Sequence, residues 1–191
     1  MRIGLLQLNP TVGDITGNTQ RLIDAIQSMD ADIIVTPELS ICGYPPRDLL
    51  YLPEFVHACV DAVQQIAMTC NTKTVLVGHP RVNQNTERVR NSVSVLQQGE
   101  ISAVSDKLLL PSYDIFDEKR YFESGDSICT FTFDGTQIGV PICEDFWMGF
   151  DANAADQYDE NPIAQYINAG CRVLICPSAS PFVVGKQRTH L

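Results

Sequence analysis

The chain has 191 residues, of which 45% are hydrophobic, and its formal net charge is −10. This length suits one domain with a sizeable core and is too short for two domains that each bury a core of that kind. An acidic chain without a run of Lys or Arg is a poor candidate for nucleic-acid binding, and no stretch approaches the roughly 20 apolar residues that span a bilayer.

Seven cysteines are present, an odd number, and none of them forms a C-x-x-C pair of the kind found in zinc or redox sites. The N-terminal segment is already polar at Gln7 and does not predict a signal peptide. We therefore expect a soluble cytoplasmic protein in which most cysteines are small buried apolar side chains.

The first half of the chain alternates between apolar strands and amphipathic helices. Residues 2–8, 33–35 and 74–78 predict strands. Apolar residues recur at helical spacing in residues 18–30 and again from Pro53 to about Cys70, so both segments predict helices. A loop rich in Gly and Pro occupies residues 42–46.

The second half is dominated by turns and hairpins. Alternating apolar residues predict one hairpin around Gln98-Gly99 and another around Asp134-Gly135. A turn-rich loop is expected at residues 107–127, a short helix at 162–169 and a last strand at 173–176. The mixture predicts an α/β domain of mixed sheets covered by helices, spanning residues 1–191 and incomplete at its C-terminal end.

Polar residues follow four of these strands directly. Glu38 follows residues 33–35, Lys107 follows 101–105 and Cys143 follows 138–142, whereas His79 is itself the last residue of a strand that ends before Pro80. Ser178 and Ser180 follow the last strand. Functional groups of α/β sheets collect beyond the carboxyl ends of strands, so we expect these side chains to converge.

A carboxylate, an ammonium and a thiol together support nucleophilic attack on an amide. A free thiol has a pKa of about 8.5 and needs a base or a nearby cation near neutral pH. Glu38 would accept the thiol proton and later deliver it to departing ammonia. Lys107 would stabilise the oxyanion together with the backbone N–H of Glu144, and water activated by Glu38 would hydrolyse the thioester on Cys143.

Each residue also has an ordinary structural interpretation. Cys143 alone would be a core side chain and Lys107 a solvated surface charge. Glu38 would cap a helix in the following loop, and Ser178 and Ser180 would be turn residues beside prolines. Their shared position at strand ends favours the catalytic interpretation without deciding it.

Three segments decide between these interpretations. They are residues 36–50 (TPELSICGYPPRDLL), residues 107–122, which begin KLLLP and end FDEKRYF, and residues 139–147 (GVPICEDFW). Across essentially the whole chain the sequence resembles the nitrilase, or carbon–nitrogen hydrolase, superfamily. It is most similar to the amidase domain of bacterial glutamine-dependent NAD synthetases, which implies an αββα sandwich.

The resemblance implies roles for individual residues. Glu38 would be the general base, Lys107 the oxyanion-stabilising cation and Cys143 the nucleophile. Glu118 would be a second glutamate that keeps Lys107 protonated and oriented, where the ordinary interpretation is a surface charge. The positions that would recognise glutamine are Tyr113, Glu144, Trp147, Ser180 and Lys186.

Two of these assignments have alternatives or departures. Tyr113 and Trp147 are equally compatible with amphipathic wall residues that have no ligand role. Related proteins often carry arginine where this chain has Lys186, so bidentate binding of the substrate carboxylate would be lost there.

The resemblance also implies partners for the chain. Ammonia from glutamine would serve the ATP-dependent amidation of nicotinate adenine dinucleotide to NAD by a synthetase domain, whose S-G-G-x-D-S signature is absent from these 191 residues. We expect no cofactor on this chain, with ATP and magnesium belonging to that missing domain. The superfamily commonly forms homo-oligomers. No metal site is expected, because the three histidines lack ligand spacing.

Other functions remain open on the sequence. One is a stand-alone amidase that acts on another small amide, and one is a catalytically silent fragment that serves in assembly. A hydrolase that depends on His57 or His79 is disfavoured, because no G-x-S-x-G elbow is present.

Overall fold

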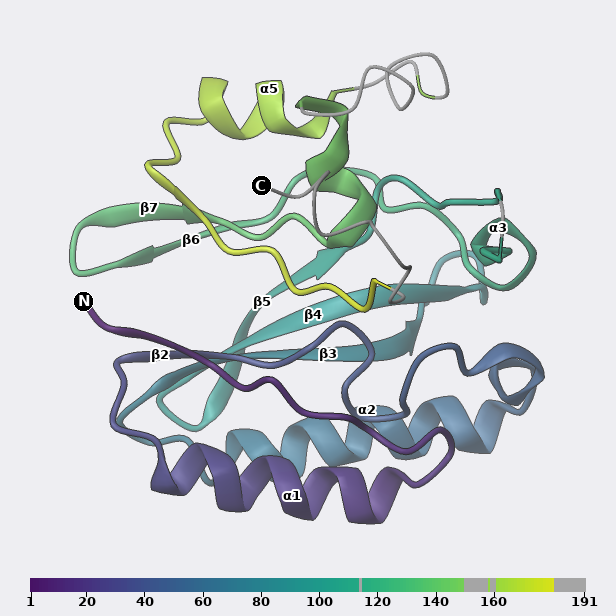
Figure 1. Cartoon of the computed structure of the whole chain (residues 1–191), viewed down its shortest axis with the longest axis horizontal. Coiled ribbons are helices and arrows are strands. Elements are labelled where there is room, and N and C mark those ends of the chain that lie inside the picture. The colour runs from purple at the N-terminus through teal and green to yellow at the C-terminus, as the bar shows by residue number, and fades with distance from the viewer. Residues whose placement is uncertain (114, 150–157, 159–160, 181–191) are drawn as a thin grey trace, which may run out of the picture.

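The computed structural model describes residues 1–113, 115–149, 158 and 161–180. Two β-sheets stack face to face, with two helices outside one sheet and one helix outside the other (Figure 1). The predicted α/β sandwich with αββα layering is therefore confirmed.

The larger sheet contains five strands in the order β1-β2-β3-β4-β5. They are β1 (Ile3–Leu5), β2 (Ile33–Val35), β3 (Thr74–Val82), β4 (Val89–Gln97) and β5 (Glu100–Asp106). The first three are parallel because helical crossovers join them, whereas β3, β4 and β5 form consecutive antiparallel hairpins. Parallel β2 and β3 therefore end at the same edge of the sheet.

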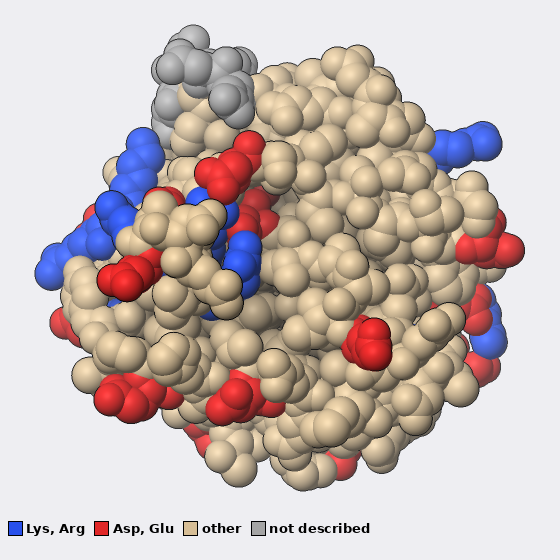
Figure 2. Space-filling model, turned by 180° about the vertical axis from the view of Figure 1, so that it is seen from behind, with Lys and Arg blue, Asp and Glu red and all other residues tan. Residues whose placement is uncertain are grey.

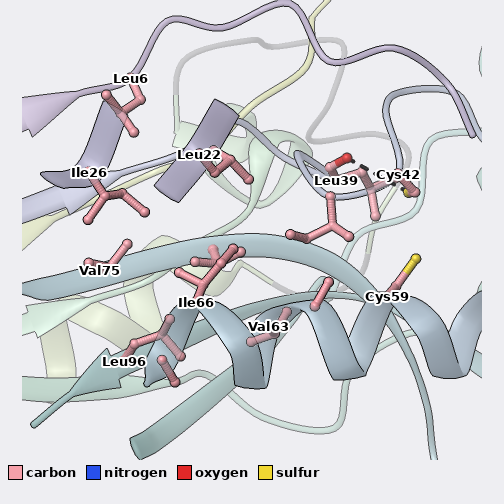
Figure 3. Packing of buried hydrophobic residues seen from close by; sticks show 14 of the residues in the cluster. Leu6, Leu22, Ile26, Leu39, Cys42, Cys59, Val63, Ile66, Val75 and Leu96 are labelled. Carbon is pink, nitrogen blue, oxygen red and sulfur yellow. Dashed lines mark hydrogen bonds between the residues drawn. The ribbon is translucent and has the colours of Figure 1, made fainter. Parts of the chain in front are cut away.

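Helices α1 (Ile15–Ser28) and α2 (Pro53–Ala67) cover the outer face of this sheet. Figure 3 shows Leu22 and Ile26 of α1 and Val63 and Ile66 of α2 packed in one cluster with Val75 of the sheet. Each of these side chains is almost fully buried, and burying one such side chain contributes about 1.5 to 3 kcal/mol. The cluster fixes the sheet that carries the strand ends.

The smaller sheet contains β6 (Thr130–Phe133), β7 (Thr136–Gly139) and β8 (Val173–Leu174), and α5 (Pro162–Asn168) lies outside it. Tyr166 of α5 is 1% exposed, and a Cβ at Gly139 would lie 2.4 Å from its ring. A second apolar cluster includes Leu76 and Val95 of the larger sheet with Ile138 of the smaller one. This cluster joins the two sheets.

Several boundaries differ from those predicted. Helix α1 begins at Ile15 because the Asp14 side chain caps it, accepting the N–H of Gly17 at 2.9 Å. The turn-rich loop contains a short helix, α3 (Glu118–Tyr121), and two 3₁₀ segments, η1 (Arg47–Tyr51) and η2 (Cys143–Gly149), were not predicted. Strands β1 and β8 are shorter than predicted, and β7 begins and ends earlier than predicted.

The prediction that His79 ends a strand before Pro80 is wrong, because β3 continues to Val82. Pro80 pairs with Asn91 of β4. The pairing of β3 with β2 ends at Leu76, before Pro80 is reached. The edge of β3 that would face β2 is therefore unpaired at Pro80, and a residue without an N–H donor is tolerated there. His79 is buried and bonded to the Ser94 hydroxyl at 2.7 Å.

On the face seen in Figure 2, acidic and basic side chains are interspersed and large areas carry neither. Within the part of the chain that the structure describes, no helix is long and apolar enough to cross a membrane.

We predict that Gly78→Ala destabilises the protein by about 1 to 3 kcal/mol, because it overpacks a rigid site. A Cβ at Gly78 would lie 2.4 Å from the carbonyl oxygen of Pro37 and 2.6 Å from the amide nitrogen of Leu39, and both are backbone atoms. The change is measured by urea unfolding. Gly4→Ala is the control, because the added Cβ there meets first the flexible side chain of Met29. Equal losses in the two variants would contradict the prediction.

Candidate active site

The centre of the candidate site is the Lys107 ammonium group, which lies between two carboxylates. Its Nζ is 2.7 Å from Oε1 of Glu38 and 2.9 Å from both carboxylate oxygens of Glu118. All three residues are buried, and Lys107 is 1% exposed. The structure therefore excludes the solvated surface charges that were the alternative interpretations of Lys107 and Glu118.

Glu38 is held by a loop that is attached to β3. The Ser40 hydroxyl donates to the Gly78 carbonyl at 3.1 Å, and the Gly78 N–H donates to the Thr36 hydroxyl at 3.1 Å. Leu39 has a φ of 51°, a left-handed conformation that is uncommon for leucine. The contact of this turn with Gly78 brings the backbone of Glu38 against the sheet.

Two groups that the sequence analysis did not single out also bind Glu38. The Asn91 amide of β4 donates to Oε1 at 2.7 Å, and the Ala179 N–H donates to Oε2 at 3.0 Å. Asn91 stands out only as a polar residue in a buried strand, whereas a backbone donor such as Ala179 has no sequence signal.

Lys107 follows β5 directly, as predicted. Its N–H donates to the Asn91 carbonyl at 2.8 Å, and its own carbonyl accepts the Gly125 N–H at 2.8 Å. Burial works against the charged ammonium, but the charges of Glu38 and Glu118 outweigh it and hold the pKa of Lys107 well above its usual value. The site thus contains a fixed cation.

Glu118 begins α3 and accepts the Tyr44 hydroxyl at 2.8 Å. Burial raises the pKa of Glu118, even though Lys107 acts in the opposite direction. Tyr44 belongs to the Gly-Tyr-Pro-Pro segment of the sequence, which gives that distinctive segment a contact in the site.

Cys143 is the first residue of η2 and lies beyond the end of β7 rather than directly on it. Its φ is 45°, and its N–H donates to the Pro177 carbonyl at 3.0 Å. Such a conformation costs of order 1 to 3 kcal/mol and persists only where its surroundings hold it.

The Cys143 side chain is buried and interacts electrostatically with both Glu38 and Lys107. Burial raises the pKa of the Cys143 thiol, Glu38 raises it further, and Lys107 acts in the opposite direction. The thiol is therefore protonated at neutral pH and needs a base to become a nucleophile.

Glu144 follows Cys143 and is also buried. The Tyr113 hydroxyl lies 3.0 and 2.9 Å from its two carboxylate oxygens, and the Tyr158 hydroxyl lies 3.3 Å from one of them. The structure thus joins predicted Tyr113 and Glu144 and adds Tyr158. The residue that follows Cys143 thus carries a buried carboxylate with two phenol partners.

The remaining predicted site residues are Trp147, Ser178, Ser180 and Lys186. Trp147 is half-buried in η2, and Ser178 and Ser180 are exposed in the segment after β8, where Ser178 donates to the Cys176 carbonyl at 3.5 Å. Lys186 lies outside the described residues.

Asp145 links the segments that carry Cys143 and Lys107. One carboxylate oxygen accepts the N–H groups of Leu108 and Leu109 at 3.0 and 2.7 Å, and the other accepts the Ile142 N–H at 2.9 Å. The sequence analysis gave Asp145 no role, although it lies beside the predicted nucleophile.

Among the described residues, no group of three or more His, Cys, Asp and Glu side chains is arranged to hold a metal ion. The cation beside the two glutamates is the ammonium of Lys107.

We predict that Lys107→Met lowers the unfolding free energy by about 3 to 5 kcal/mol at neutral pH, because it leaves two buried carboxylates without their cation. The loss shrinks on acidification. A buried carboxyl with a raised pKa, such as Glu118, binds protons more tightly in the folded state, so stability falls as pH rises. Urea unfolding at several pH values measures this. The exposed Lys119→Met is the control, and a pH-independent loss in Lys107→Met would contradict the prediction.

We also predict that Asp145→Asn costs about 1 to 3 kcal/mol, because an amide nitrogen would face an N–H donor that Asp145 now accepts. Burial raises the pKa of Asp145 to about 7, so the thermal midpoint is measured at mildly alkaline pH, where the carboxylate is ionised. Asp134→Asn in the exposed β6–β7 turn is the control. A midpoint unchanged in both variants would show that the link between the two segments contributes nothing.

Sequence comparison gives relatives along almost the whole chain. The carbon-nitrogen hydrolase family profile matches residues 2–161. A glutamine-dependent NAD(+) synthetase of Synechocystis sp. is 38% identical over 97% of this chain and 35% of the relative. One of Xanthomonas campestris is 39% identical over 98% of this chain and 33% of the relative. The chain thus spans about a third of the length of these curated relatives.

Solved structures give the same result for the fold. A glutamine-dependent NAD+ synthetase from Acinetobacter baumannii matches with a TM-score of 0.80 at 31% identity, over 99% of this chain and 34% of that one. A nitrilase-superfamily amidase from Nesterenkonia matches with a TM-score of 0.77 at 21% identity, over 98% of this chain and 68% of that one, a likeness of fold alone. The family profile covers most of the sequence, and the chain belongs to the carbon–nitrogen hydrolase family.

Proposed function

We propose that this chain hydrolyses the side-chain amide of glutamine with Cys143 as nucleophile, Glu38 as general base and Lys107 as oxyanion-stabilising cation. The observation that carries the proposal is the buried Lys107 ammonium, held between Glu38 and Glu118 in electrostatic contact with the Cys143 thiol. A buried charge cluster of this kind is costly to fold and is typical of functional sites.

The groups present support each step of the reaction. Glu38 takes the thiol proton while Sγ of Cys143 bonds to the amide carbon. Lys107 and the Glu144 backbone N–H stabilise the oxyanion. When the intermediate collapses, the nitrogen takes the proton from Glu38 and leaves as ammonia. Water, deprotonated by Glu38, then attacks the thioester and releases glutamate and the thiol.

The protonation states fit this sequence of steps. Since burial and Glu38 raise the pKa of the Cys143 thiol, the resting nucleophile is neutral. Proton transfer to Glu38 then leaves a thiolate beside the Lys107 cation, so charge separation in the buried site stays small. Glu118 keeps the cation in place throughout, because it remains paired with Lys107 while Glu38 is protonated.

For substrate binding we propose that Glu144 binds the α-ammonium of glutamine and Lys186 its α-carboxylate, with Tyr113, Trp147 and Ser180 around them. The support is the pair of phenols that holds the buried carboxylate of Glu144, the residue that follows the proposed nucleophile. The remaining lone pairs of this carboxylate would accept the N–H groups of an ammonium ligand.

We further propose that the ammonia serves a synthetase domain that uses ATP and magnesium to convert nicotinate adenine dinucleotide to NAD. The support is the similarity to relatives named glutamine-dependent NAD(+) synthetase, of which this chain spans about a third. A cytoplasmic location and a homo-oligomeric state remain predictions that accompany this proposal.

The test is covalent labelling with the glutamine-like electrophile 6-diazo-5-oxo-norleucine, followed by intact mass measurement and peptide mapping. We expect one adduct on Cys143, prevented by excess glutamine and absent in Cys143→Ala. Glutamate release from glutamine should be lost in the same variant and in Lys107→Met. Cys171→Ser is the control, since Cys171 lies outside the site before β8. Adducts elsewhere, or glutamine turnover by Cys143→Ala, would sink the assignment.

The alternative within the same chemistry is an amidase for another small amide. Comparing glutamate formation with hydrolysis of simple aliphatic amides separates the two, and Glu144→Gln should weaken only glutamine hydrolysis. Faster turnover of the aliphatic amides would favour the alternative. A folded chain with neither labelling nor turnover would favour the silent assembly module.

A further inference from the structure

Asn91 is a polar exception on an otherwise apolar strand face. Side chains on a strand alternate between faces, so Asn91 shares its face with Val93 and Val95, which pack in the cluster between the sheets. Asn91 itself is 0% exposed. Burying an amide among valines is costly unless its hydrogen bonds are made.

Asn91 contacts two of the proposed catalytic residues at once. Its side-chain Nδ2 donates to Oε1 of Glu38 at 2.7 Å. Its backbone carbonyl oxygen accepts the backbone N–H of Lys107 at 2.8 Å. The side-chain oxygen of Asn91 is buried without a hydrogen-bond partner among the described residues. Among the described residues, the bond to Glu38 is therefore the one hydrogen bond that the Asn91 side chain makes.

The donors around Glu38 distinguish its two carboxylate oxygens. Oε1 receives both Asn91 Nδ2 and Lys107 Nζ, each at 2.7 Å. Among the described residues, Oε2 receives only the Ala179 N–H, at 3.0 Å. Each carboxylate oxygen offers about two lone-pair sites, so Oε1 is saturated and Oε2 retains a free one.

We propose that Asn91 is a positioning residue that, with Lys107, occupies Oε1 of Glu38 and so makes Oε2 the oxygen that accepts the Cys143 thiol proton. This rests on the proposed function of Glu38 as the base. Without the Asn91 donor, the carboxylate of Glu38 loses one of the bonds that fix its orientation, so proton transfer from the thiol becomes slower.

The chain offers a matched control in Asn83, which is also buried and donates its Nδ2 to a glutamate, Glu123, at 2.8 Å. Asn83 lies past the end of β3, and its carboxylate partner is bound to Arg90 rather than to Lys107. Asn91→Leu and Asn83→Leu thus each remove one amide donor from one carboxylate, and only the first touches the proposed site.

The experiment measures kcat and KM for glutamine hydrolysis in the wild type, Asn91→Leu and Asn83→Leu. In Asn91→Leu we expect kcat to fall about a hundredfold, because a general base that is no longer held in place contributes less to proton transfer. KM should stay unchanged, because the Asn91 side chain is fully buried and its bond goes to Glu38. The kcat and KM of Asn83→Leu should match the wild type even if its thermal midpoint falls.

A second readout needs no turnover. The rate at which iodoacetamide alkylates Cys143, followed by intact mass, reports proton transfer from the thiol in the absence of glutamine. Alkylation should be slower in Asn91→Leu than in the wild type. Asn91→Asp, which keeps the size of the side chain and replaces the amide donor with a carboxylate oxygen, should slow it as well. It also keeps the test available if Asn91→Leu does not fold.

The outcomes separate the two proposals. If alkylation of Cys143 slows in the Asn91 variants while the wild type does not hydrolyse glutamine, the positioning role stands and the proposed function fails. If glutamine is hydrolysed but neither kcat nor the alkylation rate falls in Asn91→Leu or Asn91→Asp, Asn91 is only a core residue and the inference is overturned. Equal losses in the Asn83 variant would overturn it as well.

Discussion

The buried ion cluster of Lys107, Glu38 and Glu118 is the constraint on which the rest of the site depends. An ammonium that is 1% exposed has lost its water, and Coulomb attraction to both carboxylates has to compensate. Removing one member of such a cluster leaves an uncompensated buried charge. The surrounding loops are therefore built to hold all three groups at hydrogen-bond distance.

This requirement explains features that otherwise look unrelated. Gly78 admits the backbone of the Glu38 turn, because a side chain there would meet main-chain atoms of Pro37 and Leu39. Asp145 ties the backbone beyond Lys107 to the backbone before Cys143 through three N–H groups. Both contacts position main-chain atoms, and the position of the main chain determines where the side chains of a loop can reach.

Two members of this cluster, Glu38 and Lys107, act on the pKa of the Cys143 thiol in opposite directions. Burial and Glu38 raise the pKa of Cys143, and Lys107 offsets only part of this effect. A neutral thiol near a carboxylate is the arrangement that the proposed mechanism requires, in which the nucleophile is activated during attack rather than beforehand. This gives importance to Asn91, which binds the proposed base.

The sequence by itself determined most of the local elements, although not every strand end. Period-3.6 and period-2 patterns predicted α1, α2, both hairpins and the central strands, because burial of one face is written into residue spacing. The positions of Glu38, Lys107 and Cys143 after strands followed from the same patterns, and the resemblance supplied Glu118, Tyr113 and Glu144. The sequence did not predict the helix cap at Asp14 or the 3₁₀ turns, because individual side-chain and backbone contacts determine them. It also did not predict that β3 continues through Pro80, which is possible because β2 no longer pairs with β3 there.

Only the tertiary structure decided which groups meet. Asn91 and Glu38 are far apart in sequence, as are Asp145 and Leu109, and no periodicity links them. Ala179 acts through its backbone N–H, which every residue except proline carries, so its identity holds no information about the contact. Strand order and sheet stacking bring these atoms together. Hydrogen-bond partners, and with them the distinction between the two oxygens of Glu38, depend on that spatial arrangement rather than on local residue choice.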